Sequence, residues 1–190
     1  MATITMKEFC QACQELISTS DKLRDGWKYE TFGQSEFPIL VKKYILNFDQ
    51  NKTVFSKKNN QQLGHSEHIV TYECHIIFSE SYSNPVLYFV ASKMNGKPLD
   101  LEEVWQNSGV ANSSGLTDDQ RWFFVTQQEH PVLMRPFFQL HPCHTSSFMM
   151  PVTASNKTNY IVAWLSIVLP AVGLHFDADK YYSYCAQNCD

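Results

Sequence analysis

Cys143 stands between two imidazole side chains in the segment FFQLHPCHTSSFMMP, residues 137–151. A thiol beside histidines can bind a metal ion, act as a nucleophile, carry an acyl group as a thioester, or fill space in a core. Pro142 cannot donate a hydrogen bond to a strand ladder, and the Thr-Ser-Ser that follows His144 is polar. We therefore expect a strand to end here and the thiol to lie in a loop.

The metal and hydrolase interpretations of this segment lack supporting residues. Zinc binding by His141, Cys143 and His144 would need a further ligand such as His130. Successive residues of an extended chain point to opposite sides, which separates His144 from the other two. A Cys–His hydrolase needs a histidine oriented by Asn or Asp, and no protease signature surrounds Cys143. We expect neither a metal nor a cofactor.

A thioester carrier demands less of the surroundings of Cys143. An acyl group that arrives as a thioester passes to a thiolate with little change in free energy, so no strong base is required. An amine then attacks the carbonyl carbon, and a hydrogen-bond donor must stabilise the resulting oxyanion. Packing of Cys143 as a small hydrophobe is the remaining alternative, and its polar neighbours argue against it.

Hydrophobic periodicity predicts the elements that would position this cysteine. An amphipathic helix is expected over residues 4–18, capped by Thr5 or Thr3, with Cys10 and Cys13 on its apolar face, where packing is favoured over redox or zinc chemistry. Extended segments are predicted over residues 27–32, 37–48, 68–78, 85–93, 121–128 and 132–140. In 68–78, one face would carry Val70, Tyr72, Cys74, Ile76 and Phe78.

The remaining segments are a short helix or turn over 99–106 and a second helix over 159–169, with Thr158 as its cap and Pro170 and Gly173 at its end. Residues 49–67 form a polar, flexible loop in this prediction, with His65 and the adjacent His68 either solvated or a metal pair. The tail, 176–190, has no strong pattern. The fold class is therefore α+β: an antiparallel meander with helices packed on it. An edge strand among 68–78 and 85–93 could also pair with a partner strand.

Composition sets the broad class of protein. The chain has 190 residues, 44% of them hydrophobic and 18% charged, which suits a single domain spanning 1–190 with a sizeable core. The net charge of −4 and the lack of a basic block argue against nucleic acid as a partner. No apolar run reaches the roughly 20 residues of a transmembrane helix, and no signal peptide is recognisable. We expect reduced cysteines and a cytoplasmic protein.

An N-terminal helix, a four-strand meander, an irregular stretch carrying a cysteine and then a helix is the element order of a ubiquitin-conjugating enzyme. The sequence resembles the ubiquitin-conjugating-enzyme-like enzymes of autophagy over most of its C-terminal two-thirds, whereas the first 65 residues match in layout only. The resemblance is carried by SYSNPVLYFVAS (81–92), NGKPL (95–99), VTQQEHPVL (125–133), PFFQLHPCHTSSFM (136–149) and NYIVAWLSIVLPAVGL (159–174).

The resemblance implies a ubiquitin-conjugating-enzyme-like core and a specific reaction. Cys143 would accept the C-terminal glycine of a ubiquitin-like modifier, autophagy-related protein twelve, from the activating enzyme, autophagy-related protein seven. It would pass the modifier to a lysine of the target, autophagy-related protein five, and form an isopeptide bond. The alternative is an inactive scaffold of the same fold that only binds autophagy partners.

One departure from ordinary ubiquitin-conjugating enzymes concerns the oxyanion donor. Those enzymes carry His-Pro-Asn shortly before the cysteine, whereas His130-Pro131 is followed here by Val132. The candidate supporting residues, either as donors or as groups that shape the site, are Tyr72, Gln127, Gln128, Glu129, His130, His141 and His144. We expect His130 and His141 to shape loops, and His144 either to stabilise a thiolate or to be solvated. Tyr72 could equally be a core residue, and 127–129 an edge strand facing water.

Overall fold

One antiparallel sheet of six strands forms the centre of the molecule, in the order β1-β2-β3-β4-β6-β5. The computed structural model describes residues 3–32, 39–47, 69–107, 125–153 and 159–188. The strands are β1 Lys28–Glu30, β2 Ile39–Asn47, β3 Ile69–Ser79, β4 Asn84–Lys93, β5 Val125–Glu129 and β6 Pro136–Leu140. This arrangement confirms the predicted meander and the two additional short strands that precede Cys143.

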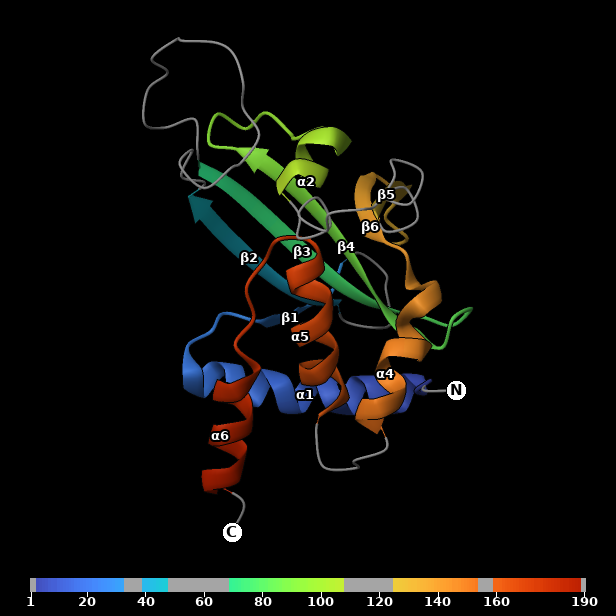
Figure 1. The fold of residues 1–190 in the computed structure, drawn as a ribbon, viewed down its shortest axis with the longest axis vertical. Coiled ribbons are helices and arrows are strands. Elements are labelled where there is room, and N and C mark those ends of the chain that lie inside the picture. Colours follow the sequence, from blue (N-terminus) through green and yellow to red (C-terminus); the bar gives the residue numbers. More distant parts are fainter. Residues whose placement is uncertain (1–2, 33–38, 48–68, 108–124, 154–158, 189–190) are drawn as a thin grey trace.

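The helices pack mainly on one face of this sheet, and Figure 1 shows α5 lying against it, with α1 crossing at the lower end. Their bounds are α1 Met6–Leu23, α2 Leu101–Asn107, the 3-10 helix η2 Pro142–His144, α4 Thr145–Thr153, α5 Tyr160–Ala171 and α6 Ala178–Asn188. Thr5 caps α1, as predicted, in a capping box with Glu8. The α+β fold class is therefore the one expected from the sequence.

Alternation along β3 places its apolar side chains against the helices. Tyr72, Cys74 and Ile76 are fully buried in one core cluster that also contains residues of α1 and α5. Trp164 and the rest of the inward surface of α5 fill the space above them, so this helix packs on the sheet. Cys13 belongs to the same core and is a free thiol, which confirms the packing interpretation of the Cys-x-x-Cys pair.

Short polar or proline-containing segments carry little periodicity, so the sequence leaves two helices unassigned, and one predicted helix cap is wrong. Residues 145–153 form α4 although Pro151 lies inside the helix. The unassigned tail forms α6, whose Tyr181 is buried in the core. The cap of α5 is Asn159, whose side chain accepts from two backbone N–H groups, in place of the predicted Thr158. The segments 48–68, which contains His65 and His68, and 108–124 lie outside the described residues.

Strand order also corrects the idea that 68–78 or 85–93 is an edge. β3 is paired on both sides, by β2 and β4. β4 is paired by β3 and by β6, although its register with β6 covers only Tyr88↔Gln139 and Phe89↔Phe138. β6 is therefore attached to the centre of the sheet by a short ladder, and this strand leads directly to Cys143.

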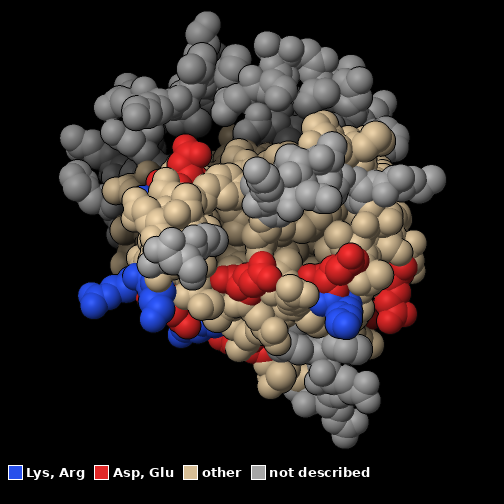
Figure 2. Space-filling view, turned by 90° about the horizontal axis from the view of Figure 1, so that it is seen from below, with Lys and Arg blue, Asp and Glu red and all other residues tan. Residues whose placement is uncertain are grey.

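Charged side chains of both signs are mixed on the side of the molecule that carries α1 (Figure 2). The exposed positions of α1 include Lys7, Glu8, Glu15, Asp21 and Lys22, so neither sign dominates the helix surface. This distribution agrees with the small net charge of −4.

Candidate active site

Cys143 lies in a tight helical turn between the end of β6 and the start of α4. Pro142 is buried and begins the 3-10 helix, where its fixed φ suits the first helical position. The backbone N–H of Cys143 donates to Nδ1 of His141 over 3.2 Å, so His141 acts as the N-cap of the turn. The Cys143 side chain is exposed and is a free thiol. Burial as a small hydrophobe is thereby excluded.

His141 is held in place by a second aromatic ring. Tyr82, in the turn that joins β3 to β4, meets the imidazole edge-on with ring centroids 6.1 Å apart. Tyr82 is 43% exposed, which makes it one of the few large apolar side chains at the surface. Sequence reasoning missed this contact because 59 positions separate Tyr82 and His141 and no local pattern joins them. His144 follows Cys143 directly in the chain and is exposed.

The three polar residues 127–129 do not reach the Cys143 turn. All three are exposed on β5, which pairs only with β6 within the described strands. In that register Glu129 faces Pro136, whereas Val125 faces Leu140, the last residue before His141. At about 3.3 Å per residue, Gln127, Gln128 and Glu129 lie toward the far end of the hairpin from the thiol. They form an edge strand facing water.

Tyr72 is a core residue. Its side chain is fully buried, stacks on Phe89, and faces the helices in the middle of β3. In the register of β3 with β4 it lies opposite Ala91, seven residues along β3 from Ser79 at the Tyr82 turn. The structure thus places Tyr72 among the core residues, which is the alternative given for it, and on a part of β3 away from the Cys143 turn. The hydroxyl has no hydrogen-bond partner among the described residues, and burial raises the pKa of Tyr72.

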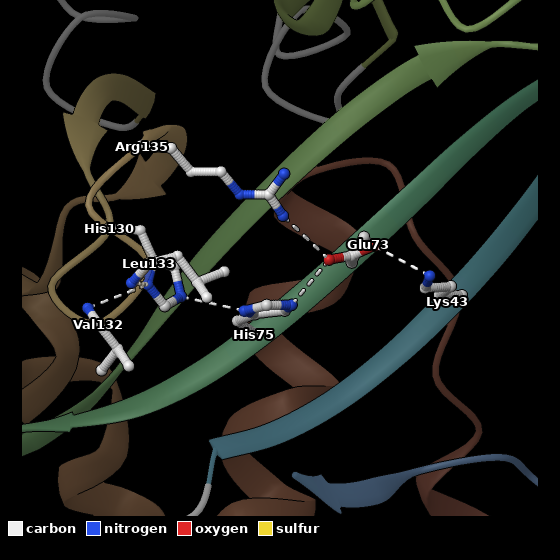
Figure 3. A network of polar contacts seen from close by, with 7 residues as sticks. All are labelled: Lys43, Glu73, His75, His130, Val132, Leu133 and Arg135. Carbon is white, nitrogen blue, oxygen red and sulfur yellow. Dashed lines mark hydrogen bonds and ion pairs between the residues drawn. The ribbon is translucent and has the colours of Figure 1, made fainter. Parts of the chain in front are cut away.

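His130 is buried beneath the connection between β5 and β6 and takes part in a polar network (Figure 3). Its Nδ1 accepts the backbone N–H groups of Val132 and Leu133, at 3.2 and 3.0 Å. Its Nε2 lies 3.0 Å from Nδ1 of His75, a buried residue of β3. The prediction that His130 shapes a loop agrees with these contacts, whereas His75 was missed because it lies on the face of β3 opposite the apolar positions.

Glu73 closes the network on the same face of β3. Its Oε1 lies 3.1 Å from Nε2 of His75 and 3.6 Å from the Arg135 guanidinium, and its Oε2 lies 3.1 Å from Nζ of Lys43. Burial alone would raise the pKa of Glu73, but the hydrogen bond and charge of Lys43, together with His75, lower it. The carboxylate is therefore held ionised between cationic and hydrogen-bond donor groups.

Both imidazoles of the network are neutral near pH 7. Burial lowers the pKa of His130 to about 4, assisted by the nearby His75 and Arg135. Burial also lowers the pKa of His75, and it outweighs the opposing effect of Glu73. No group of three or more His, Cys, Asp or Glu side chains that could hold a metal ion occurs in the part of the chain that the structure describes. The candidate site itself presents the exposed, free thiol of Cys143.

Comparison with known proteins gives this thiol its context. Residues 8–179 match the family described as "Autophagocytosis associated protein, active-site domain". The chain is 32% identical to "Ubiquitin-like-conjugating enzyme ATG10" of Homo sapiens, over 89% of this chain and 88% of the human protein. The protein of the same name in Arabidopsis thaliana is 38% identical over 54% of this chain and 49% of its own length.

The chain belongs to the ATG10 family of ubiquitin-like-conjugating enzymes. It is thus a conjugating transferase of autophagy, as the resemblance implied. Similarity to "Autophagy-related protein 3" of Dictyostelium discoideum is weaker, at 23% identity over 56% of this chain and 32% of that protein. The ATG10 assignment therefore rests on the longer and more similar matches.

A solved structure supports the fold of this ATG10 family member. The chain superposes on the "Crystal structure of Autophagic E2, Atg10" with a TM-score of 0.53 and 14% sequence identity, covering 91% of this chain and 98% of that one. This likeness confirms the predicted conjugating-enzyme-like core. None of the helices in the described segments is long and apolar enough to cross a membrane.

Proposed function

We propose that Cys143 carries the ubiquitin-like modifier as a thioester between the activating enzyme and a lysine of the target protein. The observation that carries the proposal is an exposed, free thiol in a turn fixed by the His141 cap, in a chain of the ATG10 family. Another exposed thiol in the described segments, Cys185, lies on the C-terminal helix α6. A carrier cysteine must be accessible to two large partners in turn, and Cys143 satisfies this requirement.

The reaction has two acyl transfers. In the first, the Cys143 thiolate attacks the carbonyl carbon of the modifier's C-terminal thioester, a new C–S bond forms, and the cysteine of the activating enzyme leaves as a thiolate. In the second, a lysine amine attacks the same carbon, a C–N bond forms, the bond to Cys143 breaks, and the amine loses a proton to solvent. The first step exchanges one thioester for another, so only the second is strongly favourable.

The partners that we propose are those implied by the family resemblance. Autophagy-related protein twelve would be the modifier, autophagy-related protein seven the activating enzyme, and autophagy-related protein five the target. We also propose that residues 1–190 act as a single ubiquitin-conjugating-enzyme-like domain in the cytoplasm. A reducing compartment would keep Cys143 available as a thiol, and the five cysteines of the described segments are free.

A charging assay tests the role of Cys143. The protein is mixed with activating enzyme, ATP and modifier and is then run on gels with and without reductant, beside the variants Cys143→Ser, Cys143→Ala and Cys185→Ala. We expect a reductant-sensitive band for the wild type and for Cys185→Ala, a reductant-resistant band for Cys143→Ser, and none for Cys143→Ala. Equal charging of wild type and Cys143→Ala would overturn the proposal and favour another cysteine. Failure of the wild type to charge would favour the inactive scaffold.

A further inference from the structure

β6 depends on side-chain contacts for its position because its ladder to β4 covers only two residue pairs. On one face Phe138 enters the core. On the other face Phe137 packs against the His130 and His75 rings, with centroids 4.5 and 5.1 Å away. Gln139, on the same face as Phe137, donates to the hydroxyl of Tyr88 over 3.0 Å. The imidazole pair is therefore part of the surface on which β6 rests, and Phe137, which contacts it, lies six positions before Cys143.

The hydrogen bonds of this pair run in a single direction. A backbone N–H can only donate, so the bonds from Val132 and Leu133 require Nδ1 of His130 to be unprotonated. The proton of neutral His130 is then on Nε2 and is donated to Nδ1 of His75. His75 in turn carries its proton on Nε2, where the Glu73 carboxylate accepts it. Each ring has one tautomer that satisfies all of its partners.

The hydrogen-bond network begins and ends in the connection formed by residues 130–135. Arg135, which pairs with Glu73, lies in the same connection as Val132 and Leu133, and its carbonyl accepts the N–H of His130. The Phe32 ring stacks on the outer side of His75 with centroids 5.4 Å apart. His75, together with Glu73, therefore links residues 130–135 to the central strand β3.

We propose that His75 is a positioning residue for conjugation at Cys143. By accepting from His130 and donating to Glu73, it secures residues 130–135 on β3 and thereby holds β6 and the Cys143 turn in register. This inference rests on the proposed function of Cys143, and it adds a residue that lies 68 positions away in the sequence and on a different strand.

Two substitutions separate hydrogen bonding from packing. His75→Phe keeps an aromatic ring in the site but leaves the Nε2–H of His130 without an acceptor, which is costly for a buried donor. His75→Gln supplies an amide that can accept at oxygen and donate at nitrogen. Thr71→Val changes the same face of β3 outside the network and serves as the matched control. Thermal unfolding identifies a temperature at which every variant is folded.

Hydrogen exchange and single-turnover kinetics provide independent measurements. In His75→Phe we expect the amides of Val132 and Leu133 to exchange about tenfold faster, because local opening becomes easier. Discharge of the charged protein to free L-lysine should slow by roughly fivefold to tenfold in kcat, with KM for lysine unchanged. His75→Gln and Thr71→Val should stay within about twofold of wild type in both measurements, since each leaves the network's donors and acceptors paired.

The outcomes distinguish this inference from the proposal for Cys143. Unchanged exchange and discharge in His75→Phe would overturn it, as would equal losses in the Phe and Gln variants, which indicate packing alone. Faster exchange with normal discharge would show that His75 secures the connection but does not position the cysteine, and would also reject the inference. If the wild type does not charge, the function of Cys143 fails, and ¹⁵N spectra of the two imidazoles still test their Nε2–H tautomers.

Discussion

The two faces of the central sheet are built on different principles. The face toward α1 and α5 is apolar, and on β3 it consists of Tyr72, Cys74 and Ile76 within one continuous core. The opposite face of the same strand carries Glu73 and His75 in a directed chain of hydrogen bonds. Apolar packing tolerates exchange of one hydrophobe for another of similar volume, whereas a buried polar network requires every donor and acceptor to be present.

The histidines next to Cys143 in the sequence and those in the polar network also differ in how they are held. His141 and His144 flank the thiol in the sequence, yet one caps a turn and the other is exposed. His75 and His130 are 55 residues apart and lie in hydrogen-bond contact. Closeness to Cys143 in the sequence was therefore a poor guide to organised imidazole chemistry, because the sheet brings together groups that the chain separates.

The largest effect is expected on the helix-covered face. Trp164→Ala removes a fully buried indole from α5 and should destabilise the protein by about 3–5 kcal/mol through lost burial and a cavity. Ile167→Ala, at a 38% exposed position of the same helix, should cost less than about 1.5 kcal/mol. Denaturant unfolding measures both. Similar losses in the two variants would mean that the apolar core is not concentrated on this face.

Lowering the pH should destabilise the fold through the buried histidines of the polar face. Because burial lowers the pKa of His130 to about 4 from an unfolded value near 6.5, the unfolded chain binds this proton more readily than the folded one. The neutral ring therefore stabilises the fold above about pH 6.5, and on the order of 2–3 kcal/mol is lost as the pH falls toward 4. His75, whose pKa is also lowered, adds in the same direction.

Unfolding free energies measured between pH 7.5 and 4 test this expectation, with His130→Asn as the comparison, since its amide oxygen can still accept from the chain but does not titrate in this range. The variant should start less stable and lose less between pH 6.5 and 4. A parallel decline in both proteins would show that other groups cause the acid sensitivity and that the imidazole pair is not held neutral by the fold.

The sequence predicted the apolar face of β3 but not the buried polar network on its other face, and the reasons are physical. The alternation of Val70, Tyr72, Cys74 and Ile76 fixes which side of β3 is buried, because side chains alternate across a strand. The same alternation assigns His75 to the opposite side, which is normally solvated in an antiparallel sheet. Its burial depends on Phe137 and the 130–135 connection, and such long-range contacts leave no periodic signal.

At the candidate site, too, the sequence predicted some features and not others. The proline and polar residues around Cys143 correctly predicted that a strand ends before the thiol, although Cys143 lies in a 3-10 helix and not in the predicted loop. They gave no sign that residues 145–153 are helical, since Pro151 and the Thr-Ser-Ser run are atypical of helix interiors. The contact of Tyr82 with His141 depends on where the β3–β4 turn lies relative to β6, which only the assembled sheet determines.

A smaller effect is expected at the cap of the Cys143 turn. His141→Ala removes the acceptor of the Cys143 N–H and should cost about 0.5–2 kcal/mol, mostly as local fraying, with charging slowed several-fold. His141→Asn provides a good capping oxygen and should restore most of the rate. Thioester formation under single-turnover conditions measures both variants. If Asn is as slow as Ala, the imidazole has a role at Cys143 beyond capping.

The smallest effect should come from Tyr72→Phe. Tyr72 precedes Glu73 on β3, but its side chain points to the other face of the sheet, into the apolar core. Its hydroxyl is buried without a partner among the described residues, so its removal should change the unfolding free energy by less than about 0.5 kcal/mol, or raise it slightly. Discharge of the thioester to free lysine should be unchanged, since the ring stacks on Phe89 and lies away from the Cys143 turn. Thermal unfolding and the discharge assay are sufficient measurements. A tenfold loss of discharge with unchanged stability would indicate that an oxyanion donor lies on the helix-covered face. That face would then contribute to the reaction and not only to stability.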